Sequence, residues 1–61
     1  ELLVIEMTAT GELLILDISG KIVQEQHLDE GKNAVEIGQL STGTYIAKIK
    51  GRSNATIFHV Y

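Results

Sequence analysis

The sequence predicts an all-β fold, a small antiparallel β-sandwich of about six to seven strands. Six glycines recur every five to eleven residues along the 61-residue chain, and β-branched apolar stretches lie between them. Regular turn residues between short strand-like stretches are typical of β meanders and sandwiches. A helical fold is disfavoured, because no segment keeps an i, i+3, i+4, i+7 apolar stripe over three turns without crossing a glycine.

Six strands are expected, at Leu2–Met7, Glu12–Asp17, Lys21–Leu28, Ala34–Ile37, Thr44–Lys50 and Ala55–Tyr61. Each is a short stretch with β-branched or other apolar residues that ends near a turn-forming residue. The segment Glu12–Ile18 is apolar on both faces, which predicts a central strand covered on both sides.

Alternation of residue types assigns the faces of the fourth strand. Val35 and Ile37 should face the core, and Ala34 and Glu36 should face outward. The last strand, Ala55–Tyr61, carries apolar residues on both faces, so the sequence leaves its inward face open.

The fifth strand shows the clearest alternation in the chain. Tyr45, Ala47 and Ile49 should face the core. Lys48 and Lys50 lie on the opposite face of the same strand and should reach water.

Two turns carry their own chemistry. In Asp17-Ile18-Ser19-Gly20, the Asp can accept backbone N–H bonds and the Gly can take a positive φ, which predicts a hairpin with a G1-type bulge. In Gly38–Gly43, a glycine stands at each end of a short connection between the sheets. We expect Leu40, within this connection, to cover the end of the core. We expect Gly43, which leads into the fifth strand, to need a positive φ or a close approach that a side chain forbids.

Size and charge exclude several function classes. A folded monomer of 6.7 kDa should expose roughly 3,900 Å², which leaves one thin core and no room for a deep enzyme cleft. The net charge is −3, whereas binding to nucleic-acid phosphates usually needs a basic surplus. No apolar run exceeds four residues, far short of the roughly 20 of a membrane span. The absence of Cys fits an extracytoplasmic location, and the chain, opening on Glu1, looks like a piece of a longer protein.

Metal-ligating residues are too few to form a site. His27 and His59 are the only imidazoles, and a metal site would need a third and a fourth ligand. Asp29 and Glu30 are near in sequence only to His27. Exposed strand histidines are the preferred interpretation, and no metal or cofactor is expected.

Catalytic motifs are also incomplete. A triad drawn from Ser19, His27 and Asp17 lacks an oxyanion hole and a pocket. Gly20-Lys21 and Gly31-Lys32 have neither the earlier Gly nor the following Ser or Thr of a phosphate loop. We therefore predict that the chain is not an enzyme.

Lys48, Lys50 and Arg52 form a basic stripe at strand spacing, with Lys21 as a possible neighbour. One interpretation is a solvated face that discourages edge pairing. The other is a docking patch for an acidic partner. The triplet Asn54-Ala55-Thr56 matches a glycosylation acceptor, which matters only in a eukaryotic secretory setting.

Three motifs in a fixed order are more specific than any one of them. Glu12–Val23 is an apolar strand followed by Asp-x-Ser-Gly-Lys and an apolar pair, and Gly31–Ile37 is a Gly-x-Asn lead into a short strand. Leu40–Ile49 is a Leu-x-x-Gly-x-Tyr-x-x-x-Ile strand. Together they resemble the C-terminal sorting domains of the bacterial type IX secretion system, over roughly Gly11 to Val60. The chain departs from that family in having no Pro-Asn-Pro-type opening and no basic residue at its end.

The resemblance implies an immunoglobulin-like β-sandwich, with residues 1–61 forming a single sorting domain at the C-terminus of a secreted passenger. The passenger, N-terminal to Glu1, would reach the periplasm by a separate signal. The outer-membrane translocon would then recognise this domain as a sorting signal. A cell-surface sortase removes the domain in many members, and others retain it.

Recognition by edge-strand or surface capture is the expected mechanism. The final strand, Ala55–Tyr61, and the basic stripe are the expected contact regions, and the recognition residues we select are Lys48, Lys50, Arg52, Phe58 and Val60. We assign structural roles in the turns to Asp17, Ser19, Gly20, Gly43 and Tyr45.

The alternative is an accessory immunoglobulin- or fibronectin-like binding or spacer module. An exposed aromatic platform for carbohydrate would favour that alternative. Only Tyr45, Phe58 and Tyr61 are available for one, and Tyr45 should be buried.

Overall fold

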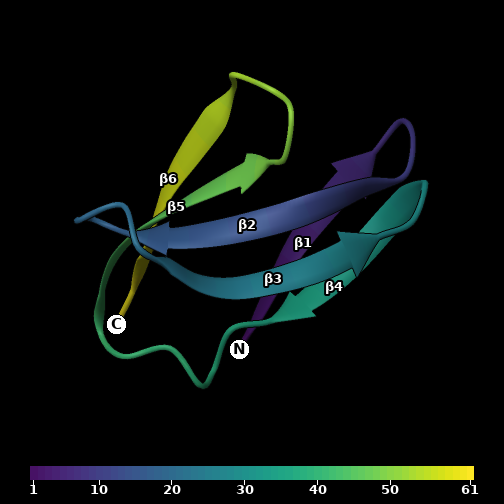
Figure 1. Ribbon diagram of the computed structural model, residues 1–61. Helices are drawn as coiled ribbons and strands as arrows, with labels where there is room; N and C mark the ends of the chain where they lie inside the picture. The colour runs from purple at the N-terminus through teal and green to yellow at the C-terminus, as the bar shows by residue number, and fades with distance from the viewer.

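A computed structural model describes all residues, Glu1–Tyr61, and shows six strands and no helix (Figure 1). The strands are β1 (Leu2–Met7), β2 (Gly11–Asp17), β3 (Ile22–Leu28), β4 (Gly31–Glu36), β5 (Gly43–Ile49) and β6 (Ala55–Val60). The all-β prediction is confirmed. The largest difference in bounds is in β4, which begins at Gly31 rather than at Ala34.

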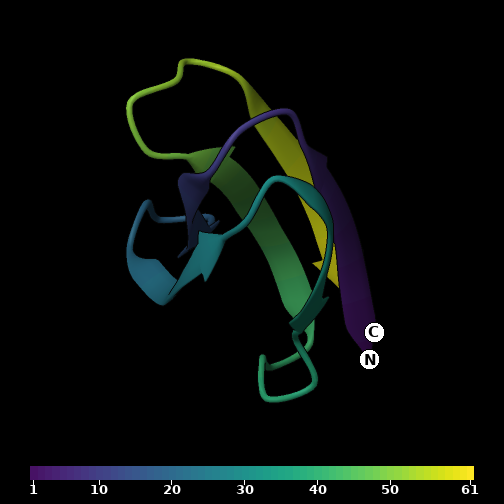
Figure 2. The same cartoon turned by 90° about the vertical axis from the view of Figure 1, so that its right-hand side faces the viewer.

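The strands form two antiparallel sheets of unequal size. β1 pairs with β4, and the larger sheet has the order β3-β2-β5-β6. The chain passes between the sheets three times, after β1, after β3 and after β4. Both termini lie at one end of the sandwich, and the β5–β6 hairpin loop lies at the other (Figures 1 and 2).

β2 is the central strand on which the core is built. Leu13 and Ile15 on β2 are 1% and 0% exposed, and Val35 on β4 is also fully buried. These side chains meet because alternate residues of each strand point inward and the inward faces of the two sheets pack against each other. The whole core is eight buried side chains, Met7, Leu13, Ile15, Leu28, Val35, Ile37, Tyr45 and Val60.

The faces of β4 and β5 agree with their alternation, whereas the outer face of β2 differs from expectation. Tyr45 is buried, and Ala47 and Ile49 pack against the core as partly buried residues. The prediction that β2 is covered on both sides is wrong. Leu14 and Leu16 are only half-buried, because the β1–β4 sheet covers the opposite face and no third layer exists.

The turn between β2 and β3 is organised by the side chain of Asp17. Its Oδ1 accepts hydrogen bonds from the Ser19 hydroxyl (2.6 Å), the Ser19 N–H (2.9 Å) and the Lys21 N–H (3.0 Å). The Gly20 N–H donates to the Asp17 carbonyl, and Gly20 has a φ of +91°. This is the expected hairpin turn with a G1-type bulge. A further register shift at Val23 twists the start of β3.

The corner between β3 and β4 is held by Asn33, a role that the sequence pattern did not reveal. The Asn33 Nδ2 donates to the carbonyls of Asp29 (2.8 Å) and Gly31 (3.1 Å), and its Oδ1 accepts the Asp29 N–H. Gly31 has a φ of +100°, which lets the chain turn from one sheet into the other.

The crossing into β5 is fixed by Tyr45 rather than by Gly43. The Tyr45 hydroxyl donates to the Ser41 carbonyl (2.6 Å), the kind of contact known as a tyrosine corner in immunoglobulin-type sandwiches. Leu40 packs against the core, as expected. The expectation for Gly43 is wrong, because its φ is not positive and a Cβ there would meet nothing nearer than 3.8 Å.

Replacing Gly31 by Ala should lower the free energy of unfolding by about 1–2 kcal/mol, because the variant forces an L-residue into the left-handed region. In a domain of this size that corresponds to a fall of roughly 4–8 °C in the thermal midpoint per kcal/mol, measured by circular dichroism. Gly43→Ala is the matched control and should melt at or above the wild-type midpoint. Equal midpoints for the two variants would contradict this account of the β3–β4 corner.

Asp17 should contribute to stability in a pH-dependent way. The Ser19 hydroxyl, followed by the Lys21 N–H, lowers the pKa of the Asp17 carboxyl. A lowered pKa means that the stabilisation is present above the unfolded-state pKa and is lost as pH falls through the folded-state pKa. The thermal midpoint of Asp17→Asn should therefore lie below that of wild type at about pH 6 and approach it at about pH 2. Glu25→Gln removes an exposed carboxylate that accepts no such bonds. Its thermal midpoint should change with pH in parallel with that of wild type.

Candidate recognition surface

The three basic residues selected from the sequence gather at the β5–β6 hairpin. Lys50 and Arg52 are exposed, and neither they nor Lys48 makes a salt bridge. The expectation that Lys48 is fully solvent-facing is wrong, because it is half-buried. The register places Lys48 directly between Leu14 on β2 and Ala55 on β6, so neighbouring strands cover its stem.

Phe58 and Val60 face inward, which corrects their selection as accessible recognition residues. Val60 is 6% exposed and belongs to the core. Phe58 stacks on Tyr45 across the strands, with ring centroids 5.8 Å apart. The outward face of β6 instead presents Ile57, which is 66% exposed, and Tyr61, just beyond the strand, is 94% exposed.

An apolar row crosses the outer face of the larger sheet. The register aligns Ile22, Leu16, Ile46 and Ile57, one from each strand in sheet order. Ile22 and Ile57 are exposed, whereas Leu16 and Ile46 are half-buried. The sequence showed these residues, but only the pairing of the strands brings them into one row.

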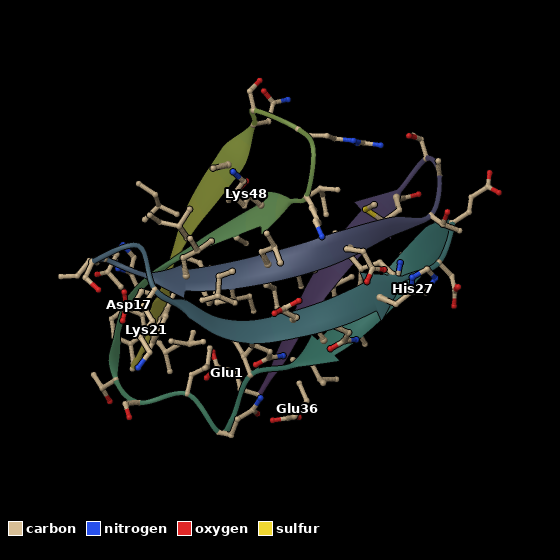
Figure 3. All side chains as sticks on the ribbon, in the orientation of Figure 1. Glu1, Asp17, Lys21, His27, Glu36 and Lys48 are labelled. Carbon is tan, nitrogen blue, oxygen red and sulfur yellow. The ribbon has the colours of Figure 1, made fainter.

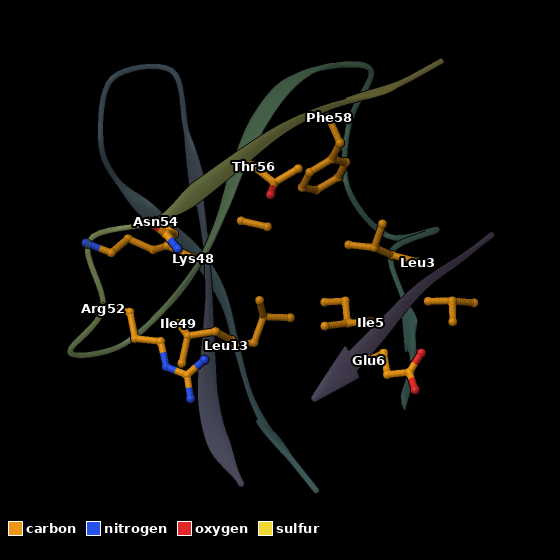
Figure 4. A pocket seen from close by; sticks show the side chains of 12 residues that line it. Leu3, Ile5, Glu6, Leu13, Lys48, Ile49, Arg52, Asn54, Thr56 and Phe58 are labelled. Carbon is orange, nitrogen blue, oxygen red and sulfur yellow. The ribbon is translucent and has the colours of Figure 1, made fainter. Parts of the chain in front are cut away.

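A groove of about 390 Å³ lies on the inner side of the molecule, between β1 and the β5–β6 half of the larger sheet (Figure 4). Its apolar lining includes Leu3, Ile5, Leu13, Ile49 and Phe58. The sequence alone did not predict this groove, because each apolar residue of its lining such as Leu3, Ile49 or Phe58 resembles an ordinary inward-facing residue.

The groove follows from the unequal sizes of the two sheets. Two strands cannot cover four, and β1–β4 lies over β2 and β3 while β5 and β6 extend beyond it (Figure 1). The inner face of β5 and β6 is therefore only partly covered, and Ala47, Ile49 and Phe58 remain partly exposed there.

Asp17, Ser19 and His27 do not come together as a catalytic triad. Asp17 and Ser19 lie in the β2–β3 turn, and His27 lies toward the far end of β3 (Figure 3). No group of three or more His, Cys, Asp or Glu residues is placed to hold a metal ion. His27 and His59 are on β3 and β6, the two opposite edges of the larger sheet, so they do not meet.

His27 instead lies between two carboxylates. Its Nδ1 is 2.5 Å from Oε2 of Glu12, the residue directly opposite on β2, and its Nε2 is 3.5 Å from Oδ1 of Asp29. The hydrogen bond with Glu12 is the main reason that the pKa of His27 is raised, against a smaller opposing effect of desolvation.

A family model for the secretion system C-terminal sorting domain matches residues 1–60. The chain belongs to this family, the sorting domains of type IX secretion. No curated protein and no solved structure matches it. The chain forms no helix long and apolar enough to cross a membrane.

Membership of this family defines the general role of the sorting domain. The family directs proteins to the cell surface or the extracellular space through the type IX machinery, and its members are in general non-catalytic. The three sequence motifs that carried the resemblance are the same segments whose side chains shape the Asp17 turn, the Asn33 corner and the Tyr45 crossing.

The ion pair of His27 should make the sorting domain less stable in alkali. A raised pKa means that the stabilisation is fully present below the unfolded-state pKa and is lost as pH rises through the folded-state pKa. Between about pH 5.5 and about pH 9 the thermal midpoint of wild type should fall more than that of His27→Gln. Because the pair is exposed, the difference should shrink in about 1 M salt. Parallel profiles for the two proteins at low salt would show that the pair contributes nothing.

Proposed function

We propose that this sorting domain is an address that the type IX outer-membrane translocon reads by non-covalent recognition, with residues 1–61 acting as one unit. The passenger is joined on the N-terminal side of Glu1 and reaches the periplasm by a signal of its own. After translocation a surface sortase removes the domain or exchanges it for an anchor. The observation that carries the proposal is the family match over residues 1–60.

The arrangement of the ends supports this role. The N-terminus, where a passenger is joined, lies at the opposite end of the sandwich from the β5–β6 hairpin (Figures 1 and 2). A folded passenger at Glu1 therefore leaves Lys50 and Arg52 accessible to a receptor. Both side chains are exposed and without salt bridges, so binding an acidic partner breaks no existing ion pair.

Lys48, Lys50 and Arg52 remain the proposed recognition residues, and β6 remains a proposed capture strand. Val60 contributes to that strand only by holding it on the core. The large apolar side chains that a receptor can reach on β6 and at its end are Ile57 and Tyr61. Tyr61 is the only largely exposed aromatic ring, so the chain offers no aromatic platform of the kind that a carbohydrate-binding accessory module would use.

Export of a reporter tests the proposal. A folded reporter with its own periplasmic signal, fused to the N-terminal side of Glu1, should reach the surface of a host that has the type IX machinery. The same fusion should stay in the periplasm of an otherwise identical host without a functional translocon. Surface proteolysis of intact cells, compared with lysed cells, measures the two fractions.

A destabilised control separates recognition from misfolding. Ile15→Asp places an unpaired carboxyl at a fully buried position and should unfold the domain, so its fusion should remain in the periplasm. If the folded wild-type domain gives no surface delivery in the competent host, the sorting proposal fails and the accessory-module alternative takes its place.

A further inference from the structure

The four edges of the two sheets are not equally protected against pairing with another chain. The β3 edge carries Glu25 and His27 and is interrupted by the bulge at Val23. The β4 edge carries Lys32 and Glu36. Charged residues and bulges are the usual means by which proteins blunt a free edge, so both of these edges are protected.

The sandwich is also closed on the β3–β4 side. The Gln24 side-chain amide on β3 donates to the Glu36 carbonyl on β4 (3.2 Å) and thereby links the two sheets. No comparable hydrogen bond joins β1 to β6. The open side of the sandwich is therefore the side on which the groove lies.

β1 and β6 are the two unprotected edges, and both border the groove. β6 has no Lys, Arg, Asp or Glu. β1 has one acidic residue, Glu6, and its Leu2 and Val4 are 60% and 59% exposed. β1 and β6 both contribute lining residues to the groove, whereas β4 contributes none.

The backbone of β1 is ready to accept another strand. The Ile37 N–H donates to the Glu1 carbonyl, so position 1 is hydrogen-bonded to the β4 side. Hydrogen-bonded and non-bonded pairs alternate along an antiparallel ladder. Leu2, Val4 and Glu6 therefore direct their N–H and C=O groups away from β4, toward the free edge.

Charge at one end of the groove indicates what an occupant must carry. Arg52 from the β5–β6 loop and Glu6 from β1 lie on opposite walls at the same end (Figure 4). Neither side chain forms a salt bridge with the other or with any other residue of the domain. A guanidinium beside an apolar groove is matched best by a carboxylate, which it can bind through two parallel hydrogen bonds.

We propose that this groove receives one extended segment of a translocon subunit, which adds a strand to the free edge of β1. Alternate apolar side chains of that segment enter the groove against Leu3, Ile5 and Phe58, and a carboxylate near one end binds Arg52. Main-chain hydrogen bonds to Val4 and Glu6 supply affinity, and the carboxylate sets direction and register. The proposal rests on the sorting function and names the surface through which it acts.

Two substitutions with matched controls test it in the reporter fusion described above. Val4→Pro removes the outward N–H of β1 without removing a bond to β4, and Ala34→Pro makes the same change at the directly opposite residue on the protected β4 edge. Arg52→Glu reverses the charge at the groove, and Lys32→Glu makes the same charge change on an exposed residue of β4 that does not line the groove. All four fusions are first required to melt cooperatively at a midpoint near that of wild type.

Val4→Pro and Arg52→Glu should each lower surface delivery by roughly tenfold or more, and both controls should stay within about twofold of wild type. A photo-crosslinking residue at position 4 should also link the domain to a translocon subunit, at a segment with an Asp or Glu, whereas the same residue at position 34 should not.

The outcomes separate this proposal from the sorting function. If wild type is exported and the Val4 and Arg52 variants are exported equally well, the groove proposal is overturned and the sorting function stands. A crosslink from position 4 to a second copy of the domain would also overturn it, in favour of self-association through β1. Failure of the wild-type fusion to be exported removes both proposals together.

Discussion

Leu13 and Ile15 are the side chains on which the rest of this structure depends. They project from β2, the strand with hydrogen-bonded neighbours on both sides, into the contact with the two-stranded sheet. The core consists of only eight buried side chains, and the two-stranded sheet leaves the inner face of β5 and β6 partly exposed. The groove beside β1 is thus a direct consequence of how little apolar surface 61 residues can bury.

Three polar or amphipathic side chains position the strands around this core. Asp17, Asn33 and Tyr45 each hydrogen-bond the backbone of a connection, and each does so within four residues of its own position. Such local bonds compensate for the small core, because they reduce the freedom of the connections without requiring further burial. The hydrogen-bonding residues of the motifs that identify the family therefore maintain the fold.

Charged residues are distributed unevenly over the four edge strands of the two sheets. The edges of β3 and β4 carry charged residues and are joined by the Gln24–Glu36 bond, whereas β1 and β6 are left open around the groove. A stable monomer gains nothing from two unprotected edges, which invite aggregation. Their position on one side, next to an unpaired Arg52, is the arrangement expected of a surface that is covered in use.

Local patterns in the sequence determined the elements and several of their faces. The alternation around Val35 and Ile37, the Asp17–Gly20 turn and the burial of Tyr45 depend on residues within a few positions of one another, so they can be recognised without knowledge of the fold. The family could also be predicted from the sequence, because its motifs consist of neighbouring residues that form three connections between strands.

Tertiary structure alone decided which faces are covered and which edges stay open. Phe58 and Val60 face inward, and Lys48 is half-buried between Leu14 and Ala55. Gly31 has a positive φ, whereas Gly43 does not. Each of these depends on which strands pair and how far one sheet reaches over the other. Periodicity along a single strand reports two faces but not what lies opposite them, because that is set by contacts between residues far apart in the chain.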